Sequence, residues 1–393
     1  MLKVGFVGLG FISDEHVLGY IGNEDAKIVA AADIDKETAL ARLRKWNLPY
    51  DVALYTNLED MLQQEELDLV EILTPHNLHC PMVLKAAEAN VKNISVQKPM
   101  GLNLSEANRM IEACRVNGAK LRVYENVLFY PIYSKAKELI DDGLIGELLT
   151  IRSCTMVGIR GGIEWPSAWS ASSWRGNLET AGSGPLIGDH GYHRFSLVRW
   201  FMERDFETVD CWIDSDTRLD APAFIRAKFR TAPNESPKYA QIDFTFSPQM
   251  SIPSNFWLDD FVEIVGDKGI MWINQCDAAG NREMYKNFKM SSSPVFPPIA
   301  VFIDGRVDSY LADISLAERN WSTSFVASTR HFIKSIIEGE EPIYSGENAM
   351  EIKRYILASY LSAQERCEIR LDEITLEAEE NGALQLITNF CNQ

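Results

Sequence analysis

The N-terminal residues Leu2–Ser13, LKVGFVGLGFIS, give the strongest indication of the fold. An apolar run typical of a buried strand leads directly into Gly8-Leu9-Gly10-Phe11-Ile12-Ser13, which follows the G-x-G-x-x-G/A pattern with serine in the third small position. Gly8 allows a tight turn, Gly10 allows a pyrophosphate to approach the backbone, and the N-terminus of the next helix attracts the anion. By itself the pattern is weak, and a plain strand-to-helix turn explains it equally well. The surrounding sequence decides between the two interpretations.

The surrounding residues 1–127 alternate between short β-branched runs and amphipathic stretches with helical spacing. The strands that we expect are Val4–Val7, Ile28–Ala32, Leu69–Leu73, Asn93–Val96 and Lys120–Tyr124. The expected helices include Lys36–Lys45, Met82–Asn90 and Ser105–Asn117, the last with Ser105 as its N-cap. Such alternation predicts βαβ units and an α/β fold, with a doubly wound parallel sheet of the Rossmann type formed by residues 1–127.

From residue 128 onward, strand-like segments follow one another with few helices between them. The expected strands are Leu148–Met156, Val209–Asp214, Phe224–Phe229, Ala240–Phe246, Phe261–Val265 and Ile270–Ile273. The expected helices are one that ends at Asp141 and two at Phe325–Glu338 and Asn348–Glu365. This order predicts a second, α+β domain over residues 128–372, with a large, mostly antiparallel open sheet. Residues 277–298 are expected to form a loop, and residues 373–393 a C-terminal extension.

The composition excludes several classes of protein. The chain has 393 residues, of which 46% are hydrophobic, and a net charge of −18, which disfavours binding to nucleic acid or to anionic membranes. No apolar run approaches the roughly 18 residues that span a bilayer, and the first expected strand leaves no room for a signal peptide, so we predict a cytoplasmic protein. The seven scattered cysteines contain no Cys-x-x-Cys pair and are expected to be reduced thiols.

Asp33 follows the second expected strand, where a dinucleotide-binding fold places a carboxylate that accepts the hydroxyl groups of the adenosine ribose. A carboxylate there repels a 2′-phosphate, so the predicted cofactor is NAD, and NADP is less favoured. A second role, in which Asp33 caps the following helix, is compatible with the first.

Two further polar segments follow expected strands, Thr74-Pro75-His76-Asn77-Leu78-His79 and Gln97-Lys98-Pro99. Ligands of open α/β sheets bind beyond the carboxyl ends of the strands, so we expect both segments to face the cofactor. On its own, a Lys-Pro pair is a common surface turn. The predicted cofactor-binding residues are Gly8, Gly10, Phe11, Ile12, Asp33, Thr74, Pro75, His76, His79, Gln97, Lys98 and Asn126.

In the second domain, a loop of small residues, 181–188, leads into Asp189-His190-Gly191-Tyr192-His193. On a helix, Asp189 and His193 would share one face, where the carboxylate can hold the imidazole in one tautomer and raise its basicity. The alternative is a capping aspartate beside an unrelated histidine. The six histidines show no metal-ligand spacing, so no metal site is predicted.

An aromatic and polar stretch precedes that loop, with Trp165 and Trp169 followed by Trp174-Arg175. Indole faces stack on the C–H faces of a sugar ring, and polar neighbours bind its hydroxyl groups. We therefore predict Trp174 and Arg175 as substrate-binding residues, with Arg175 also suited to a cofactor phosphate. Packing of the tryptophans at a domain or subunit interface is the alternative.

Five of these features, in this order, resemble the glucose-fructose oxidoreductase / inositol dehydrogenase (Gfo/Idh/MocA) family over roughly residues 2–372. They are the glycine turn, Asp33, the Thr74–His79 segment, Lys98-Pro99 and the glycine-rich loop into Asp189-x-x-x-His193. The resemblance implies a Rossmann domain, a C-terminal domain whose open sheet is often used for oligomerisation, and reversible hydride transfer on sugars or cyclitols. It also implies a homodimer or homotetramer.

By the same resemblance, Lys98 is similar to the lysine of the family's Glu-Lys-Pro motif, Asp189 to its positioning carboxylate and His193 to its proton-transferring histidine. These three are the predicted catalytic residues and, with Trp174 and Arg175, the predicted substrate-binding residues. Gln97 stands where the family has glutamate, which removes a negative charge beside the lysine. In the mechanism implied, His193 removes a hydroxyl proton and Lys98 stabilises the alkoxide while a hydride passes to the nicotinamide.

Other functions of the same scaffold remain as alternatives. One is an NAD-dependent glycosidase, in which transient oxidation permits elimination of the aglycone without net redox change. Another is a non-catalytic regulator that binds NAD, which the presence of Lys98, Asp189 and His193 disfavours. A third is an oxidoreductase whose substrate is an aromatic dihydrodiol instead of a sugar.

Overall fold

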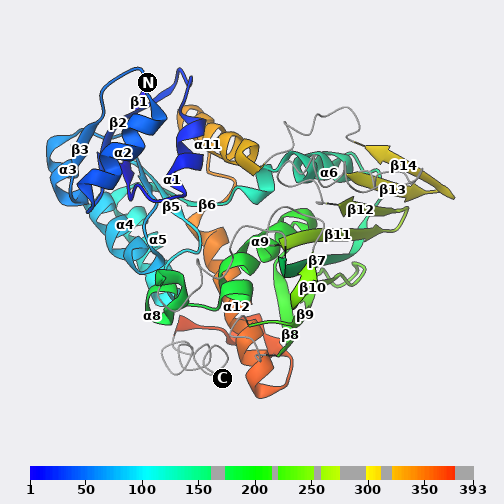
Figure 1. Cartoon of the computed structure of the whole chain (residues 1–393). Helices are drawn as coiled ribbons and strands as arrows, with labels where there is room; N and C mark the ends of the chain where they lie inside the picture. Colours follow the sequence, from blue (N-terminus) through cyan, green and yellow to red (C-terminus); the bar gives the residue numbers. More distant parts are fainter. Residues whose placement is uncertain (161–172, 215–219, 252–257, 275–297, 311–320, 377–393) are drawn as a thin grey trace. The chain divides into compact units, whose positions relative to one another are not determined.

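The computed structural model describes residues 1–160, 173–214, 220–251, 258–274, 298–310 and 321–376, which fold into two units (Figure 1). The first unit comprises Met1–Asn126, Glu179–Gly182 and Ser324–Lys353. The second comprises Val127–Leu178, Ser183–Thr323 and Arg354–Gln393. The loop expected at residues 277–298 and the extension expected at 373–393 fall almost entirely outside the described residues.

The first unit is built on a six-stranded parallel sheet in the order β3-β2-β1-β4-β5-β6. Its strands are β1 (Leu2–Val7), β2 (Ala26–Ala32), β3 (Ala53–Tyr55), β4 (Leu69–Ile72), β5 (Asn93–Gln97) and β6 (Lys120–Tyr124). Its helices are α1 (Ser13–His16), α2 (Lys36–Trp46), α3 (Leu58–Gln64), α4 (His79–Glu88), α5 (Leu104–Asn117) and α11 (Trp321–Glu338). The predicted Rossmann-type sheet is confirmed, and the strand that we did not predict, β3, is a three-residue strand at its edge.

Helices cover both faces of this sheet. Phe6 of β1 packs edge-on against Tyr20 and Trp46, with ring centroids 5.4 and 5.9 Å apart. Gly5, which faces the opposite side because side chains alternate along a strand, lies against Met61 of α3. The sheet is therefore doubly wound, as its sequence pattern predicts.

The start of α5 corrects one prediction. Its N-cap is Asn103, whose side chain accepts the backbone N–H of Glu106 at 2.8 Å. Ser105, the cap that we expected, is already inside the helix. Asn103 has the extended backbone that a cap requires, so it satisfies one of the N–H groups left open at the helix start.

Helix α11 groups with the first unit, although we expected residues 128–372 to form one domain. Phe332 and Ile333 of this helix belong to the same buried cluster as β1 and β2. The hydroxyl of Tyr124 in β6 donates to the carbonyl oxygen of Phe325 at 2.9 Å. The chain therefore returns to the first unit near its C-terminal end.

The second unit is built on a nine-stranded sheet in the order β14-β13-β12-β11-β7-β10-β9-β8-β15. Neighbouring strands are antiparallel except β7 and β10, which run parallel. The strands are β7 (Leu148–Arg160), β8 (Phe206–Ile213), β9 (Ala223–Phe229), β10 (Tyr239–Ser251), β11 (Leu258–Gly266), β12 (Ile270–Asn274), β13 (Ile299–Ile303), β14 (Arg306–Tyr310) and β15 (Ile369–Arg370). The mostly antiparallel sheet is thus confirmed, with β13, β14 and β15 added to the six strands that we expected.

The second unit also contains helical segments, and the two faces of its sheet differ in burial. The helical segments are α6 (Pro131–Asp141), α8 (Leu178–Ala181), the π-helix η5 (Pro185–His190), α9 (Gly191–Met202) and α12 (Gly346–Glu365), of which α8 and α12 contribute residues to both units. Along β9, buried and exposed residues alternate, with Ile225 buried and Phe224 exposed. One face of the strand therefore packs on the core of the unit.

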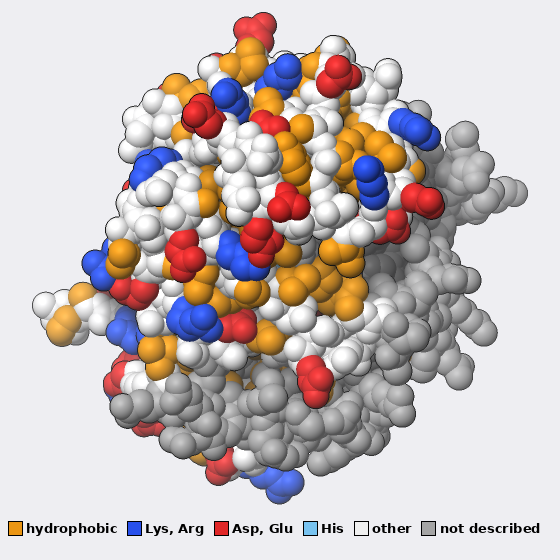
Figure 2. All heavy atoms as spheres, turned by 90° about the vertical axis from the view of Figure 1, so that its left-hand side faces the viewer, with side chains coloured by type: hydrophobic (Ala, Val, Ile, Leu, Met, Phe, Trp, Pro, Cys, Tyr) orange, Lys and Arg blue, Asp and Glu red, His pale blue; other side chains and the backbone are white. Residues whose placement is uncertain are grey.

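On the face drawn in Figure 2, acidic and basic side chains are interspersed, and the basic ones do not gather in one place. None of the helices in the described part of the chain is both long enough and apolar enough to cross a bilayer.

Candidate functional site

The glycine turn after β1 has the geometry of an anion-binding loop. Gly8 has a positive φ of 86°, and a Cβ at this position would lie 2.9 Å from Cγ2 of Thr74, so only glycine fits. A Cβ at Gly10 would meet nothing within 4 Å, so the backbone here faces open space. Ser13 is fully buried and donates its hydroxyl to the carbonyl oxygen of Gly10 at 2.6 Å, which confirms that serine fits the third small position. Phe11, between them, is largely exposed.

Asp33 supports this turn. Its Oδ2 accepts the backbone N–H of Leu9 at 2.6 Å, and its Oδ1 accepts that of Asp35 at 2.8 Å. The cap of α2 is Asp35, whose side chain accepts the N–H groups of Glu37 and Thr38, so the capping role considered for Asp33 was wrong. The carboxylate at the end of β2 is held beside the glycine turn, where dinucleotide-binding folds place it.

The segment after β4 contributes two buried histidines. Nδ1 of His76 lies 2.9 Å from the carbonyl oxygen of Ala181. The ring nitrogens of His79 lie 2.9 Å from the carbonyl oxygen of Thr74 and 3.0 Å from that of Pro99. Burial lowers the pKa of His79 to about 4, so the neutral ring donates to one of the two carbonyls. His79 thus lies between the turns after β4 and β5.

The turn after β5 contains the Lys98–Pro99 peptide, which is cis. Gln97 is buried and Lys98 is half-buried.

Pro75 and Thr74 are also half-buried, at the same edge of the sheet. The side chain of Asn126, just beyond β6, is buried and donates to the hydroxyl of Ser324 at 2.8 Å. The predicted cofactor-binding residues of the first unit therefore lie at or near the carboxyl ends of its parallel strands, as does Ile12 at the start of α1.

In the second unit, Asp189 and His193 belong to two different helical segments. Asp189 is in the π-helix η5, whereas His193 is in the first turn of α9, so the single α-helix that we expected is replaced by a π-helical turn that continues into α9. Asp189 is buried, and its Oδ2 lies 3.2 Å from Nε of Arg175. The guanidinium of Arg175 also lies over the ring of Trp174, 4.3 Å from its centroid. Four of the predicted residues of this unit, Asp189, Arg175, Trp174 and His193, are thus described, and Trp165 and Trp169 lie outside the described residues.

Asp220 is a residue that the sequence analysis missed. Its carboxylate is fully buried and accepts the backbone N–H groups of Leu186 and Ile187 at 2.8 and 2.9 Å, and the hydroxyl of Tyr360 at 2.6 Å. It therefore anchors the start of the π-helix that contains Asp189. No local motif marks it, because its partners are 33 or more residues away in the sequence.

The residues of the first unit fit NAD. The open backbone at Gly10 has room for a pyrophosphate, and the carboxylate of Asp33 lies beside the same turn. The described residues contain no group of three or more His, Cys, Asp or Glu side chains able to hold a metal ion.

Two family models match this chain. Residues 2–125 match a model described as the oxidoreductase family, NAD-binding Rossmann fold, and residues 133–271 match the GFO/IDH/MocA C-terminal domain. The chain belongs to the Gfo/Idh/MocA oxidoreductase family. Its N-terminal domain is accordingly an NAD-binding domain, and the chain is an oxidoreductase by family.

Individual relatives of this family cover different parts of the chain. A D-apiose dehydrogenase from Paraburkholderia graminis is 26% identical, over 96% of this chain and 91% of its own length. An α-N-acetylgalactosaminidase from Tannerella forsythia is 28% identical, over 49% of this chain and 46% of its own length. An oxidoreductase from Agrobacterium radiobacter, crystallised with NAD+, L-tartaric acid and magnesium, has the same fold, with a TM-score of 0.75, 19% identity and coverage of 95% and 99% of the two chains.

Proposed function

We propose that the protein is an NAD-dependent dehydrogenase that oxidises a hydroxyl-bearing carbon of a sugar or cyclitol. The observations that support this most directly are the NAD-type glycine turn in the first unit and, in the second unit, the buried Asp189 in hydrogen-bond contact with Arg175. The name of the D-apiose dehydrogenase, which matches nearly the whole chain, supports a sugar as the substrate class.

In the proposed mechanism, each polar side chain has one task. His193 accepts the proton of the substrate hydroxyl, and Asp189 orients the polar groups around the imidazole of His193. Lys98 donates a hydrogen bond to the oxygen as its negative charge develops. NAD, when bound, supplies the carbon that accepts the hydride. Arg175, held over Trp174, is the residue whose guanidinium binds sugar hydroxyls in this mechanism.

The test is a turnover assay with NAD and a panel of sugars, cyclitols and glycosides, followed both by NADH absorbance and by mass spectrometry of the products. A ketone or lactone that forms together with NADH would support the proposal. The His193→Ala variant should lower kcat by about 10²- to 10⁴-fold while leaving the Kd for NAD within about twofold. His331→Ala, a change of the same kind in helix α11, is the matched control. Equal loss of turnover and of NAD binding in His193→Ala would contradict the assigned role.

A second candidate is a redox-assisted glycosidase, favoured by the match of half the chain to an α-N-acetylgalactosaminidase. In that reaction an oxidised intermediate is reduced again before release, so NADH does not accumulate. Release of an aglycone from glycosides without NADH would select this function. Tight NAD binding with no turnover of any compound would instead favour a regulator.

A further inference from the structure

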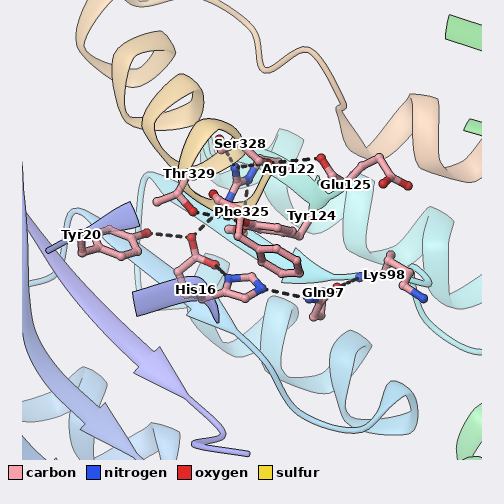
Figure 3. A network of polar contacts seen from close by, with 12 residues as sticks. His16, Tyr20, Gln97, Lys98, Arg122, Tyr124, Glu125, Phe325, Ser328 and Thr329 are labelled. Atoms are coloured by element: carbon pink, nitrogen blue, oxygen red, sulfur yellow. Dashed lines mark hydrogen bonds and ion pairs between the residues drawn. The ribbon is translucent and has the colours of Figure 1, made fainter. Parts of the chain in front are cut away.

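A buried polar network surrounds His16 in the first unit (Figure 3). His16 and Glu71 are both fully buried, and Nδ1 of His16 lies 3.2 Å from a carboxylate oxygen of Glu71. The other ring nitrogen, Nε2, lies 2.9 Å from Nε2 of Gln97. The oxygen of the same amide accepts the backbone N–H of Lys98 at 2.7 Å. One amide group therefore joins His16 to the peptide that bears Lys98.

The direction of each hydrogen bond follows from the chemistry of the groups. The backbone N–H of Lys98 can only donate, so the oxygen end of the Gln97 amide has to face it. The NH₂ end then faces His16, and Nε2 of the imidazole has to accept. The ring proton of His16 is therefore on Nδ1, where it is donated to Glu71.

The charges in the network balance when His16 is neutral. Glu71 pairs with the buried guanidinium of Arg122 at 3.1 Å and accepts a hydrogen bond from the hydroxyl of Tyr20 at 2.7 Å. Burial lowers the pKa of His16, while its contact with Glu71 acts in the opposite direction. A neutral imidazole leaves one buried carboxylate paired with one buried guanidinium, which is the arrangement with the smallest desolvation penalty.

Aromatic rings complete the surroundings of the imidazole. The ring of Tyr124 lies 3.9 Å from that of His16, and the ring of Phe325 lies 5.4 Å from it, centroid to centroid. Among the described residues, the titratable or charged groups around His16 are Glu15 of its own helix, Glu71 of β4, and Arg122 and Tyr124 of β6, and Tyr20 contacts the carboxylate of Glu71.

We infer that Gln97 is a positioning residue for Lys98, because its amide accepts the Lys98 N–H and donates to a neutral His16, which ties this peptide to α1, β4 and β6. This inference rests on the proposed role of Lys98 in the reaction. Gln97 acts through the backbone of Lys98, with no contact to substrate required. The position takes an amide because it has to accept at one end and donate at the other.

A carboxylate at position 97 would break this pattern in a specific way. Glutamate can still accept the Lys98 N–H, but its second oxygen would face the lone pair of Nε2 of His16. The repulsion is relieved when His16 takes up a second proton, which also balances the added charge. The Gln97→Glu variant therefore converts a neutral histidine into an imidazolium between two carboxylates.

The first experiment measures the protonation of His16 by NMR of protein labelled with ¹⁵N-histidine, without substrate. The His16→Asn variant identifies the His16 signals. In the wild type we expect a neutral ring with its proton on Nδ1 at pH 7. In Gln97→Glu we expect an imidazolium at pH 7, and in the control Gln63→Glu, on the exposed face of α3, we expect the wild-type signals. A wild-type ring protonated on Nε2, or a Gln97→Glu ring that stays neutral, would overturn the inference.

The second experiment measures turnover. Gln97→Met keeps the shape of the side chain but removes both hydrogen bonds, and we expect kcat at saturating NAD to fall by roughly tenfold to a hundredfold. In Gln97→Glu, kcat should fall as the pH rises through the pKa of His16. The carboxylate at position 97 can accept a hydrogen bond from His16 only while the imidazole is protonated. Wild-type kcat in Gln97→Met would overturn the positioning role. Absence of turnover in the wild type would contradict the proposed function alone, since the NMR result does not depend on turnover.

Discussion

Nε of Arg175 lies 3.2 Å from Oδ2 of Asp189, and this ion pair joins the short helix that contains Trp174 to the π-helix that leads into α9. Asp189 is nearly fully buried, whereas the Arg175 side chain is about one-third exposed. The carboxylate is thus fixed from one side by a guanidinium that still reaches solvent. Removal of that guanidinium should leave a buried carboxylate without its charged partner.

The first prediction concerns this pair. We expect Arg175→Ala to lower kcat/KM for the substrate by about tenfold or more, because both Asp189 and the sugar lose a donor, and a rise in the Kd for NAD as well would indicate contact of Arg175 with a cofactor phosphate. Steady-state kinetics and NAD titration provide the measurement. Arg226→Ala, which removes an exposed ion pair with Asp210 on the sheet surface, is the matched control and should behave as the wild type. If Arg175→Ala lowers thermal stability but not kcat/KM, the pair is structural only.

The second prediction concerns the pH dependence of stability. Burial raises the pKa of Asp220 to about 7, although three hydrogen-bond donors oppose the rise. Between pH 3.8, the ordinary pKa of an aspartate, and about pH 7, the folded protein holds a proton that the unfolded chain has lost. The contribution of Asp220 to the free energy of unfolding is therefore largest at low pH. It falls by up to about 1.4 kcal/mol per pH unit as the pH rises toward 7.

Asp220→Asn tests this dependence. The variant should be less stable than the wild type at pH 5, since its NH₂ group faces a backbone N–H donor. The difference in Tm between the two proteins should shrink from pH 5 to pH 7.5, because only the wild type loses the contribution of a bound proton. Tyr360→Phe, which removes one donor to the same carboxylate, should keep the pH dependence. A difference in Tm that stays constant with pH would contradict the titration of Asp220.

The third prediction separates two glycines of the same turn. Gly8→Ala places a Cβ 2.9 Å from Thr74 at a positive φ, so we expect a loss of about 1–2 kcal/mol or more in stability. Gly10→Ala meets no atom within 4 Å, so its Tm should match the wild type. Its methyl group occupies the space where a pyrophosphate would approach, so the Kd for NAD should rise by about tenfold or more. Thermal unfolding and NAD titration of both variants provide the measurement, and wild-type NAD affinity in Gly10→Ala would argue against this binding mode.

Much of the first unit was predictable because its signals are local. The glycine turn, the apolar strands and Asp33 each depend on a few neighbouring residues, and the parallel order follows from their alternation with helices. The missed strand β3 has three half-buried residues, so it lacks the apolar run that marks a central strand. Ser105 and Asn103 are both good capping residues, and only the backbone conformation distinguishes them.

The unpredicted parts depend on contacts between distant segments. The π-helix at Pro185–His190 has no sequence pattern of its own, and the buried Asp220 that anchors it comes from a different part of the chain. Helix α11 was predicted as a helix, but its place in the first unit follows from the burial of Phe332 and Ile333 against β1 and β2. His16 carries no motif either, and its importance appears only once Gln97 and Glu71 are seen on either side of its ring.

The last prediction concerns the choice between NAD and NADP. Asp33 holds its carboxylate beside the glycine turn, and the next side chain, Ile34, is 93% exposed. A carboxylate at this place repels a 2′-phosphate, while an arginine nearby accommodates it. The double variant Asp33→Ser, Ile34→Arg exchanges a repulsive charge for an attractive one. Each of the two substitutions should favour NADP binding over NAD binding by roughly 1.5–3 kcal/mol, if charged hydrogen bonds hold the phosphate. We therefore expect the ratio of Kd for NADP to Kd for NAD to fall by about a hundredfold or more, since about 1.4 kcal/mol corresponds to tenfold. Titration of both dinucleotides measures this ratio without any substrate, and Ile337→Arg, at an exposed position of α11, controls for added surface charge. An unchanged ratio in the double variant would mean that the adenosine ribose is bound away from Asp33.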